Sequence, residues 1–509
     1  MDRRRFIELT FASVSLALTG CGGGGGGDST STPPPVVTPP PVDDSFKELS
    51  SKLQGTVITP SSNDYNNARV VYNTRFDHIK PQAIVRCASA DDVVATIAYA
   101  KKNNIAIVPR CGAHGYAGYS MTTGIVVDIS SMDKITLGNG TATIGAGARL
   151  VDVYDQLTAK GVAIPLGSCA TVGISGLTLG GGIGVVDRAY GLTCDNLIAA
   201  EVVLADGRKI SCDATIESDL FWALRGGGGG NFGIVTSFTY KTHLTQDISV
   251  LQAYYAFSDY EKIMDAWQNW PGKLPDNIWA QLIVSWSSSA PSVYLRAFCL
   301  GSEADITPYW NQFKAETGIT PISPLISTAS YRDTMLSACG GATVEQCHVT
   351  GQTPKGTMQR NAFAATSDFF AKPIPLEGMQ TLKNFIINGQ SRPQSGMIIM
   401  DLMGGAIKNF QPTDTAFVHR DALFSFEYYS YFSGGTDASV VDSAQSWLHS
   451  FRETMKPWST NLAYVNYIDP LITDWKTAYY GENYARLAKI KRKYDPDWFF
   501  RIPQGVEPG

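Results

Sequence analysis

Three turns crowded with glycine and other small residues constrain the fold of this chain most. They are IAIVPRCGAHGYAGYS at 105–120, PLGSCATVGISGLTLGGGIGVVDRAYG at 165–191, and the glycine run at 226–230. Glycine lets a backbone adopt positive φ and approach a ligand closely. The run at 180–184 also offers successive backbone N–H groups, which suit an anion. The three turns therefore predict a long ligand that is held mainly by backbone.

One histidine and one cysteine stand in the first two of these turns. His114 lies at the centre of the first turn with very little side chain around it, and Cys169 lies in the second. By itself, the first turn is equally well interpreted as a tight surface turn with a solvated histidine. The combination of both residues with three glycine-rich turns favours a large cofactor.

A dinucleotide-binding fingerprint also matches this region, but its context is wrong. Gly228, Gly230 and Gly233 have the spacing G-x-G-x-x-G. That motif requires a strand before it and a helix after it. Here a helical pattern at 219–225 precedes the glycines and a strand-like run at 234–240 follows them. The order argues against a nicotinamide-binding Rossmann domain.

The length of 509 residues exceeds one ordinary core, so two domains are expected. In the first half, short β-branched runs alternate with helical patterns, which predicts an α+β domain. Strands are expected at 83–89, 105–110, 124–130, 135–147 and 199–210, and helices at 90–104 and 150–161.

Residues 246–465 show a different sequence pattern, in which polar and apolar positions alternate within aromatic-rich runs. These runs predict strands at 251–257, 278–286, 292–300, 396–405 and 422–432, spaced by helices such as 260–270 and 437–451. The pattern predicts one antiparallel sheet with helices on one face, as a separate substrate domain.

Charge and cysteine usage exclude some classes of function. The net charge of −5 and the lack of a basic stripe argue against nucleic-acid binding. Among nine cysteines there is no metal-ligand spacing, so a metal site is not expected. Cys339 and Cys347 are the best disulfide pair by proximity, and the connectivity of the other cysteines stays open.

The N-terminus has the pattern of a targeting segment. Three arginines at 3–5 precede an apolar run at 9–18 that is too short to span a bilayer. The sequence LTGC at 18–21 has the form of a bacterial lipobox, with a lipid expected on Cys21. We expect a twin-arginine signal peptide at 1–20 and a Gly/Pro-rich tether at 21–44. An ordinary signal with chance arginines is the alternative. The expected location is the cell envelope or periplasm of a bacterium, with membrane contact only through that lipid.

Several motifs together resemble one protein family. They are R-x-G-x-H at 110–114, G-x-C-x-T-V-G at 167–173, L-GGG-x-G at 179–184, RGGGGGNFG at 225–233, YVNYIDP at 464–470 and YYGENYARLAKIKRKYDPDWFF at 479–500. In this order they resemble the berberine bridge enzyme-like branch of the vanillyl-alcohol-oxidase flavoproteins, closest in character to bacterial and fungal oligosaccharide oxidases. The resemblance covers roughly residues 45–509.

This resemblance implies a two-domain α+β fold of the PCMH type that binds FAD. The implied parts are an FAD-binding domain at 45–245, a substrate domain at 246–465 and a C-terminal return segment at 466–509. FAD is expected to be bonded covalently to His114 through its 8α-methyl group and to Cys169 through ring carbon 6. Two small departures from the family pattern are Ala113, where glycine is usual, and Cys111. The other implied cofactor contacts are Arg110, Gly112, Ala113, Gly115, Gly118, Thr171, Val172, Gly173, Gly176, Gly181, Gly182, Gly184, Gly230, Asn231, Gly233, Ile234 and Val235.

Oxidation by a flavin removes a hydride beside a hydroxyl, so a base must take the hydroxyl proton. In the family, the second tyrosine of Y-x-N-Y is that base, which implies Tyr467. A tyrosine needs its anion stabilised, and Tyr464 and Asn466 are the nearby candidates. The alternative is that both tyrosines only pack. Asp401 and Glu427 match substrate-groove positions of relatives, although an acid on an alternating strand is often the solvent face.

Two further features bear on the acceptor and the substrate. Val172 stands where the family places a valine in members that react with oxygen. Trp279, Trp286, Tyr254 and Tyr255 offer aromatic rings that either stack on sugars or form core. We expect an FAD oxidase that acts on the anomeric hydroxyl of a carbohydrate and produces hydrogen peroxide. The alternatives are oxidation or oxidative cyclisation of a glycosylated or phenolic metabolite, and a flavin-free envelope binding lipoprotein.

Overall fold

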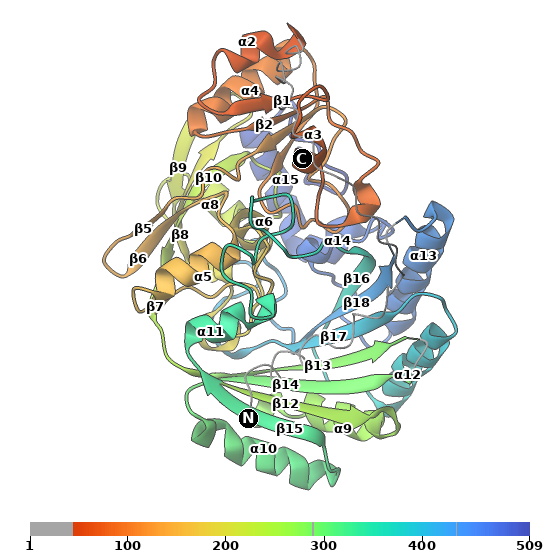
Figure 1. The fold of residues 1–509 in the computed structure, drawn as a ribbon. Coiled ribbons are helices and arrows are strands. Elements are labelled where there is room, and N and C mark those ends of the chain that lie inside the picture. The colour runs from red at the N-terminus through yellow and green to blue at the C-terminus, as the bar shows by residue number, and fades with distance from the viewer. Residues whose placement is uncertain (1–43, 288–289, 434) are drawn as a thin grey trace, which may run out of the picture.

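The computed structural model describes residues 44–287, 290–433 and 435–509. The expected signal peptide, Cys21 with its expected lipid, and nearly all of the expected tether lie outside these residues. The chain forms two lobes, with small sheets in the upper lobe and one large sheet in the lower lobe (Figure 1). In the described part of the chain, no helix has both the length and the apolar character that crossing a membrane requires.

The upper lobe begins with a four-stranded sheet in the order β1-β2-β4-β3. Its strands are β1 (Thr56–Ile58), β2 (Ala83–Arg86), β3 (Ile107–Arg110) and β4 (Ile125–Asp128). Helix α4 (Ala90–Lys102) connects β2 to β3. These two strands flank β4, and both run parallel to it. The side chain of Ser89 caps this helix by accepting the N–H of Asp92, as expected for a helix that begins after serine.

The second sheet of the upper lobe has five antiparallel strands in the order β5-β6-β10-β8-β9. The strands are β5 (Ile135–Leu137), β6 (Thr141–Gly145), β8 (Leu197–Val203), β9 (Lys209–Asp213) and β10 (Ile234–Lys241). A hairpin joins β8 to β9 and contains Gly207 at φ 87°. A two-stranded sheet pairs β7 (Val162–Ala163) with β11 (His243–Leu244). Around these strands lie α5 (Leu150–Thr158), α6 (Ile174–Gly180), α7 (Asp187–Tyr190) and α8 (Ser218–Ala223).

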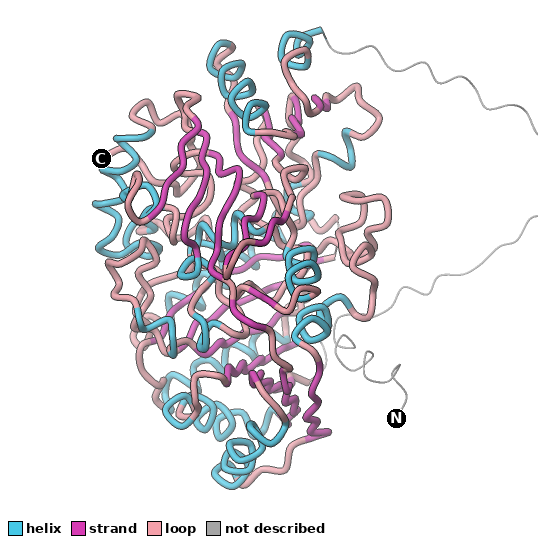
Figure 2. The backbone as a smooth tube through the Cα atoms, turned by 90° about the vertical axis from the view of Figure 1, so that its left-hand side faces the viewer, coloured by secondary structure: helices cyan, strands magenta, loops and turns pink. Residues whose placement is uncertain are grey.

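The lower lobe is built on a seven-stranded antiparallel sheet in the order β15-β12-β14-β13-β17-β18-β16. The strands are β12 (Ile248–Ala256), β13 (Ile278–Trp286), β14 (Ser292–Leu300), β15 (Ile322–Ala329), β16 (Ala362–Phe370), β17 (Gly396–Leu402) and β18 (Phe424–Phe432). The helices are α9 (Tyr260–Gln268), α10 (Glu303–Thr317), α12 (Leu376–Gln390) and α13 (Ala438–Met455), and they cover one face of the sheet (Figures 1 and 2). The predicted antiparallel sheet with helices on one face is confirmed.

A segment between α11 (Tyr331–Leu336) and β16 crosses from the lower lobe to the upper lobe. It contains a disulfide between Cys339 and Cys347, which confirms the predicted pair. His348 Nε2 lies 2.9 Å from Asp152 Oδ2 on α5. The disulfide itself packs against Val151 of the same helix. This segment therefore packs against both lobes and holds them together, in addition to the points where the chain passes from one lobe to the other.

The C-terminal segment returns to the upper lobe after the large sheet. Its helices are α14 (Trp475–Tyr480) and α15 (Tyr484–Tyr494), and α15 packs against α8. Lys491 Nζ donates to the carbonyl of Asn231 at 2.5 Å and pairs with Asp495 at 2.7 Å. The side chain of Asn231 in turn accepts the N–H of Val506. These buried polar contacts hold the end of the chain beside the third glycine-rich turn.

Candidate active site

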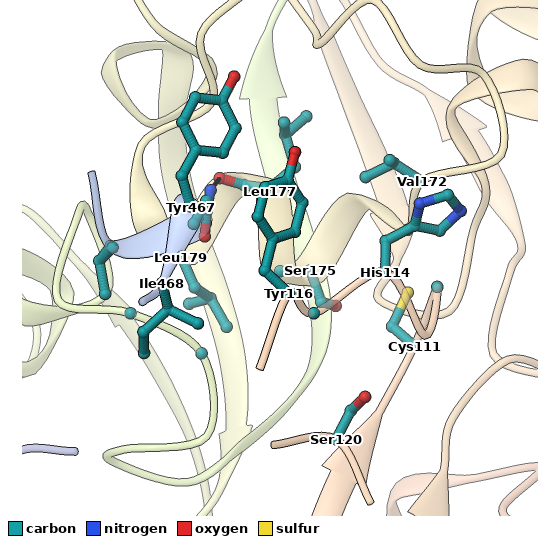
Figure 3. Close-up of a pocket in the computed structure, with 18 of the residues that line it drawn as sticks. Cys111, His114, Tyr116, Ser120, Val172, Ser175, Leu177, Leu179, Tyr467 and Ile468 are labelled. Atoms are coloured by element: carbon teal, nitrogen blue, oxygen red, sulfur yellow. Dashed lines mark hydrogen bonds between the residues drawn. The ribbon is translucent and has the colours of Figure 1, made fainter. Parts of the chain in front are cut away.

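A cavity of about 490 Å³ lies between the two lobes. The glycine-rich turns form its upper walls, and the face of the large sheet that carries no helices forms the lower wall. Figure 3 shows the side chains of His114, Tyr116 and Tyr467 in this cavity. The predicted residues that line it are Arg110, Gly112, Ala113, His114, Gly115, Cys169, Val172, Gly173, Gly176, Gly230, Asn231, Gly233, Ile234, Val235, Asp401, Glu427, Tyr464, Asn466 and Tyr467.

Five predicted cofactor residues are not part of the lining: Gly118, Thr171, Gly181, Gly182 and Gly184. Thr171 lies directly behind it, as described below. The N–H of Gly182 donates to the hydroxyl of Tyr464 at 2.7 Å. A Cβ at Gly184 would lie 2.0 Å from the carbonyl oxygen of Leu166. Gly182 and Gly184 therefore help to shape the wall from behind.

His114 is held in the turn that follows β3. Its Nε2 lies 3.0 Å from the hydroxyl oxygen of Thr171, and its ring stacks on Tyr72 with centroids 4.0 Å apart. Burial and the positive charge of Arg149 lower the pKa of His114 to about 3. The imidazole is thus neutral at physiological pH, so that one ring nitrogen keeps a lone pair.

Ala113 has φ 59°, a left-handed conformation that favours glycine. This explains physically why glycine is the expected residue there. The carbonyl of Ala113 accepts the N–H of Tyr72, which holds that residue beside His114.

Cys169 and His114 both lie next to the hydroxyl of Thr171. Its Sγ lies 3.7 Å from the same Thr171 hydroxyl, and its side chain is exposed toward the cavity. The pKa of the Cys169 thiol is raised, mainly because the surrounding protein desolvates the thiolate, while hydrogen bonds from Thr171 act in the opposite direction. The structure therefore brings the two residues of separate turns to one wall.

Arg110 lines the cavity, but its guanidinium turns into the protein. It donates to Asp128 Oδ2 at 2.7 Å and to the carbonyl of Ala68 at 2.6 Å. Both members of the ion pair are buried. Its charge is therefore already paired within the protein, and the side chain ties the first glycine-rich turn to β4.

Tyr464 and Asn466 form a hydrogen-bonded support for the turn that carries Tyr467. The hydroxyl of Tyr464 accepts the N–H of Gly182 at 2.7 Å and the amide of Asn466 at 3.0 Å. The same amide also donates to the carbonyl of Leu177 at 3.2 Å. The Tyr464 oxygen thus accepts two hydrogen bonds from the protein.

Tyr467 and Tyr116 lie side by side, with both hydroxyls pointing the same way (Figure 3). Their rings stack with centroids 5.3 Å apart, and the Tyr116 hydroxyl is hydrogen-bonded to the hydroxyl of Tyr429. The pKa of Tyr467 is raised well above 10, because the phenol is buried and because Glu427 and Asp401 bring negative charge near it. Tyr467 is accordingly a neutral phenol unless its proton has an acceptor.

Glu427 is the candidate for such an acceptor. It is 4% exposed, lines the cavity, and its Oε1 has no hydrogen-bond partner among the described residues. Burial raises its pKa to about 8, and the nearby phenols of Tyr116, Tyr429 and Tyr467 oppose this rise. A buried carboxyl with one unpartnered oxygen, poised near neutral pH, is a typical proton acceptor.

Asp401 is the second buried carboxyl of the cavity. Its Oδ1 accepts the side-chain amide of Gln281 at 2.7 Å, and Gln281 in turn accepts from Arg296 at 2.9 Å. Burial raises the pKa of Asp401 to about 6, while Gln281 and Arg296 act in the opposite direction. The three polar side chains form one chain across neighbouring strands.

The sequence patterns did not indicate several residues of this site. Tyr72, Tyr116, Gln281, Phe363 and Tyr429 all line the cavity. A signal existed for two of them. Tyr116 stands two residues after His114, and Tyr429 stands two residues after Glu427 on the same strand and therefore on the same face. The other three come together only through the fold.

Comparisons with known proteins agree with this geometry. A family profile described as FAD binding domain matches residues 81–213, and one described as berberine and berberine like matches residues 463–507. The uncharacterized FAD-linked oxidoreductase YgaK of Bacillus subtilis is 32% identical over 465 residues, covering 90% of this chain and 98% of the relative. Chitooligosaccharide oxidase of Gibberella zeae is 29% identical over 483 residues, covering 88% and 91%. The solved structure of BBE-like 1 of Physcomitrella patens superposes with a TM-score of 0.82 at 28% identity, covering 91% of this chain and 99% of that chain.

The fold and the cavity thus define an FAD-binding protein of the PCMH type. The chain belongs to the berberine bridge enzyme-like family of FAD-linked oxidoreductases. It is an FAD-dependent oxidoreductase, so the alternative of a flavin-free binding lipoprotein is excluded.

The residues present fit FAD. Gly112 and Gly173 come so close that a Cβ on Gly112 would lie 2.1 Å from the Gly173 nitrogen. A Cβ on Gly176 or Gly229, which both line the cavity, would meet no protein atom within 4 Å. Backbone therefore faces the cavity directly, as a large flat cofactor requires.

Proposed function

We propose that this protein is a carbohydrate oxidase that converts the anomeric hydroxyl of a sugar to a lactone and passes the electrons to oxygen, giving hydrogen peroxide. The observation that carries the proposal is that Tyr467 and the buried carboxyl of Glu427 line the same cavity as His114 and Cys169. The chitooligosaccharide oxidase among the relatives supports a sugar as substrate. FAD, when bound, accepts the hydride from the anomeric carbon.

The protein moves the proton in two connected transfers. The phenolic oxygen of Tyr467 accepts the proton of the substrate hydroxyl while the phenol gives its own proton to the carboxylate of Glu427. This relay avoids a free phenolate, which the raised pKa of Tyr467 disfavours. Tyr464 and Asn466 orient Tyr467 through their hydrogen bonds to the wall. The electron pair of the C–H bond leaves with the hydride, so one proton remains on Glu427 for each turnover.

We also propose that FAD is held covalently through His114 and Cys169. The neutral imidazole and the cavity-facing thiol, which share Thr171 as a neighbour, support both attachments. The test is acid precipitation of the yellow protein. Wild-type protein should keep its colour in the pellet, and the variant with both His114→Ala and Cys169→Ala should release FAD to the supernatant. Retained colour in the double variant would show that the flavin is attached elsewhere.

We further propose that oxygen is the electron acceptor and that the protein is exported to the cell envelope. Val172, a small side chain in the cavity wall, supports access of oxygen to the ring. Peroxide that forms in step with substrate oxidation, without an added electron-accepting dye, is the expected result.

Export to the envelope is tested at Cys21. The Cys21→Ser variant should lose a lipid label that the full-length protein acquires in a bacterial host.

A substrate screen tests the central claim. The purified holoenzyme is mixed with reducing sugars, sugar oligomers and phenolic alcohols, and bleaching of the flavin absorbance is followed without oxygen. Fast bleaching by reducing sugars supports the proposal. Bleaching by phenolic alcohols alone would replace it with oxidation of a phenolic metabolite.

A further inference from the structure

The sheet face that forms the lower wall of the cavity continues well beyond it. Burial alternates along β13 and β14: Leu282, Val284, Val293 and Leu295 are fully buried, whereas the residues between them are half-buried. The buried set faces the helices, so the other set forms the face that continues from the cavity (Figure 1). This second face is where a longer substrate would extend.

Cross-strand register arranges on this face a row of side chains that ends in two tyrosines. Starting in the cavity, Glu427 pairs with Ile399, Ile399 with Ile283, Ile283 with Tyr294, and Tyr294 with Tyr254. Adjacent strands lie about 4.8 Å apart, so Tyr254 stands roughly 19 Å from Glu427 along the row. This span is longer than one sugar ring.

A polar row runs beside it. Asp401 pairs with Gln281, Gln281 with Arg296, and Arg296 with Gln252. The hydrogen bonds follow the same path, because Arg296 donates to Gln281 and Gln281 donates to Asp401. At the far end, the Tyr294 hydroxyl donates to Gln252 Oε1 at 2.5 Å, which joins the two rows.

Both rows open gradually from the cavity to the edge of the sheet. Asp401 and Gln281 are each 7% exposed, and Arg296 and Gln252 are half-buried. On the edge strand β15, Leu325, the register partner of Gln252, reaches 42%. The rows therefore form a surface that leads outward from the reacting end of the cavity.

The chemistry of the two rows matches a carbohydrate chain. Tyr254 and Tyr294 stack with centroids 4.4 Å apart and present aromatic surface, on which the C–H faces of a sugar ring pack. The guanidinium of Arg296 and the amide of Gln252 are planar groups suited to sugar hydroxyls. Trp279, Trp286 and Tyr255, the other aromatic candidates, are at most 3% exposed and belong to the core.

We propose that Tyr254, Tyr294, Arg296 and Gln252 form a distal subsite for the units of an oligosaccharide that lie farther from its oxidised end. This inference rests on the proposed function and narrows it to sugar oligomers rather than single sugars. The distal subsite contributes binding only, since it lies outside the cavity in which the proton and hydride move.

The test compares binding and oxidation of glucose, cellobiose, cellotriose and cellotetraose by the holoenzyme. Binding is measured by calorimetry on the reduced enzyme without oxygen, and oxidation by peroxide release. We expect wild-type affinity to rise at least tenfold from glucose to cellotetraose. The Tyr254→Ala, Tyr294→Ala variant should lose about tenfold in affinity for the tetramer and keep its kinetics with glucose. A matched control, Tyr309→Ala on α10, should change neither.

The outcomes separate the two proposals. A wild-type enzyme without chain-length dependence, or a double variant that keeps it, would overturn the distal subsite. Length-dependent binding without oxidation would leave the distal subsite standing and refute the proposed reaction. If the alanine variant does not fold, as judged by circular dichroism, the Tyr254→Leu, Tyr294→Leu variant keeps apolar volume and should show the same loss.

Discussion

Glu427 gives the most direct test of the proton relay. A carboxylate accepts a proton only when it is ionised, and its pKa is raised to about 8. The ionised fraction is then about 1% at pH 6, about 10% at pH 7 and about 90% at pH 9. The apparent kcat/KM should therefore rise about tenfold per pH unit below pH 8 and level off above it. Replacing Glu427 by Gln should remove this rise and lower the plateau by about 10²- to 10⁴-fold.

The assay is anaerobic flavin reduction by substrate in a stopped-flow instrument at pH 6 to 9.5. Glu377→Gln, an exposed acid at the start of α12, is the matched control and should keep the wild-type profile. The raised pKa also predicts the stability of the folded protein. The folded state holds this proton more tightly than the unfolded chain does. The stability that this group contributes is therefore fully present below about pH 4.5 and is lost as the pH rises through 8. At pH 9, Glu427→Gln should accordingly unfold at a higher temperature than wild type. A Gln variant that retains both the rate and the alkaline rise would refute the relay.

Three further changes test other parts of the structure. Tyr467→Phe should keep the yellow colour and slow flavin reduction by about 10²-fold or more, and near-normal reduction would remove Tyr467 from the relay. Arg110→Ala should lower the free energy of unfolding by about 3–5 kcal/mol, because it leaves the buried carboxylate of Asp128 unpaired; a loss below about 1 kcal/mol in thermal unfolding would contradict this. Replacing Cys339 and Cys347 by serine should cost about 2–3 kcal/mol, since the short loop between them is no longer closed, and added reductant should shift wild type but not this variant.

Local patterns predicted most strands and helices correctly, and the exceptions have a common cause. β16 was not indicated because all nine of its residues are buried, including Thr366, Ser367 and Asp368. A strand that is covered on both faces shows no polar–apolar alternation. β15 is missed for the opposite reason, since most of its residues are exposed or half-buried at the sheet edge. Polar–apolar periodicity reveals a strand only when one of its faces is buried and the other is exposed. β16 is buried on both faces and β15 is largely exposed on both, so neither strand shows this pattern.

The sequence by itself determined the family, the cofactor class and many of the residues that line the cavity. Glycines in left-handed turns and two reactive side chains within them are local features, and local features are readable from order and spacing alone. The positive φ of Ala113 is likewise a local reason why glycine is the expected residue at that position.

The tertiary structure alone decided which groups act together. Tyr116 and Tyr429 meet across 313 positions of sequence, and Glu427 joins them because β18 lies beside the turn after β3. Strand register also decided that Tyr254 lies on the sheet face that continues from the cavity, while Tyr255 lies in the core. Neighbours in sequence point to opposite faces of a sheet, and the face that becomes a site depends on what packs against the other. The proposed proton path and the proposed surface for the substrate therefore both depend on the packing of the two lobes.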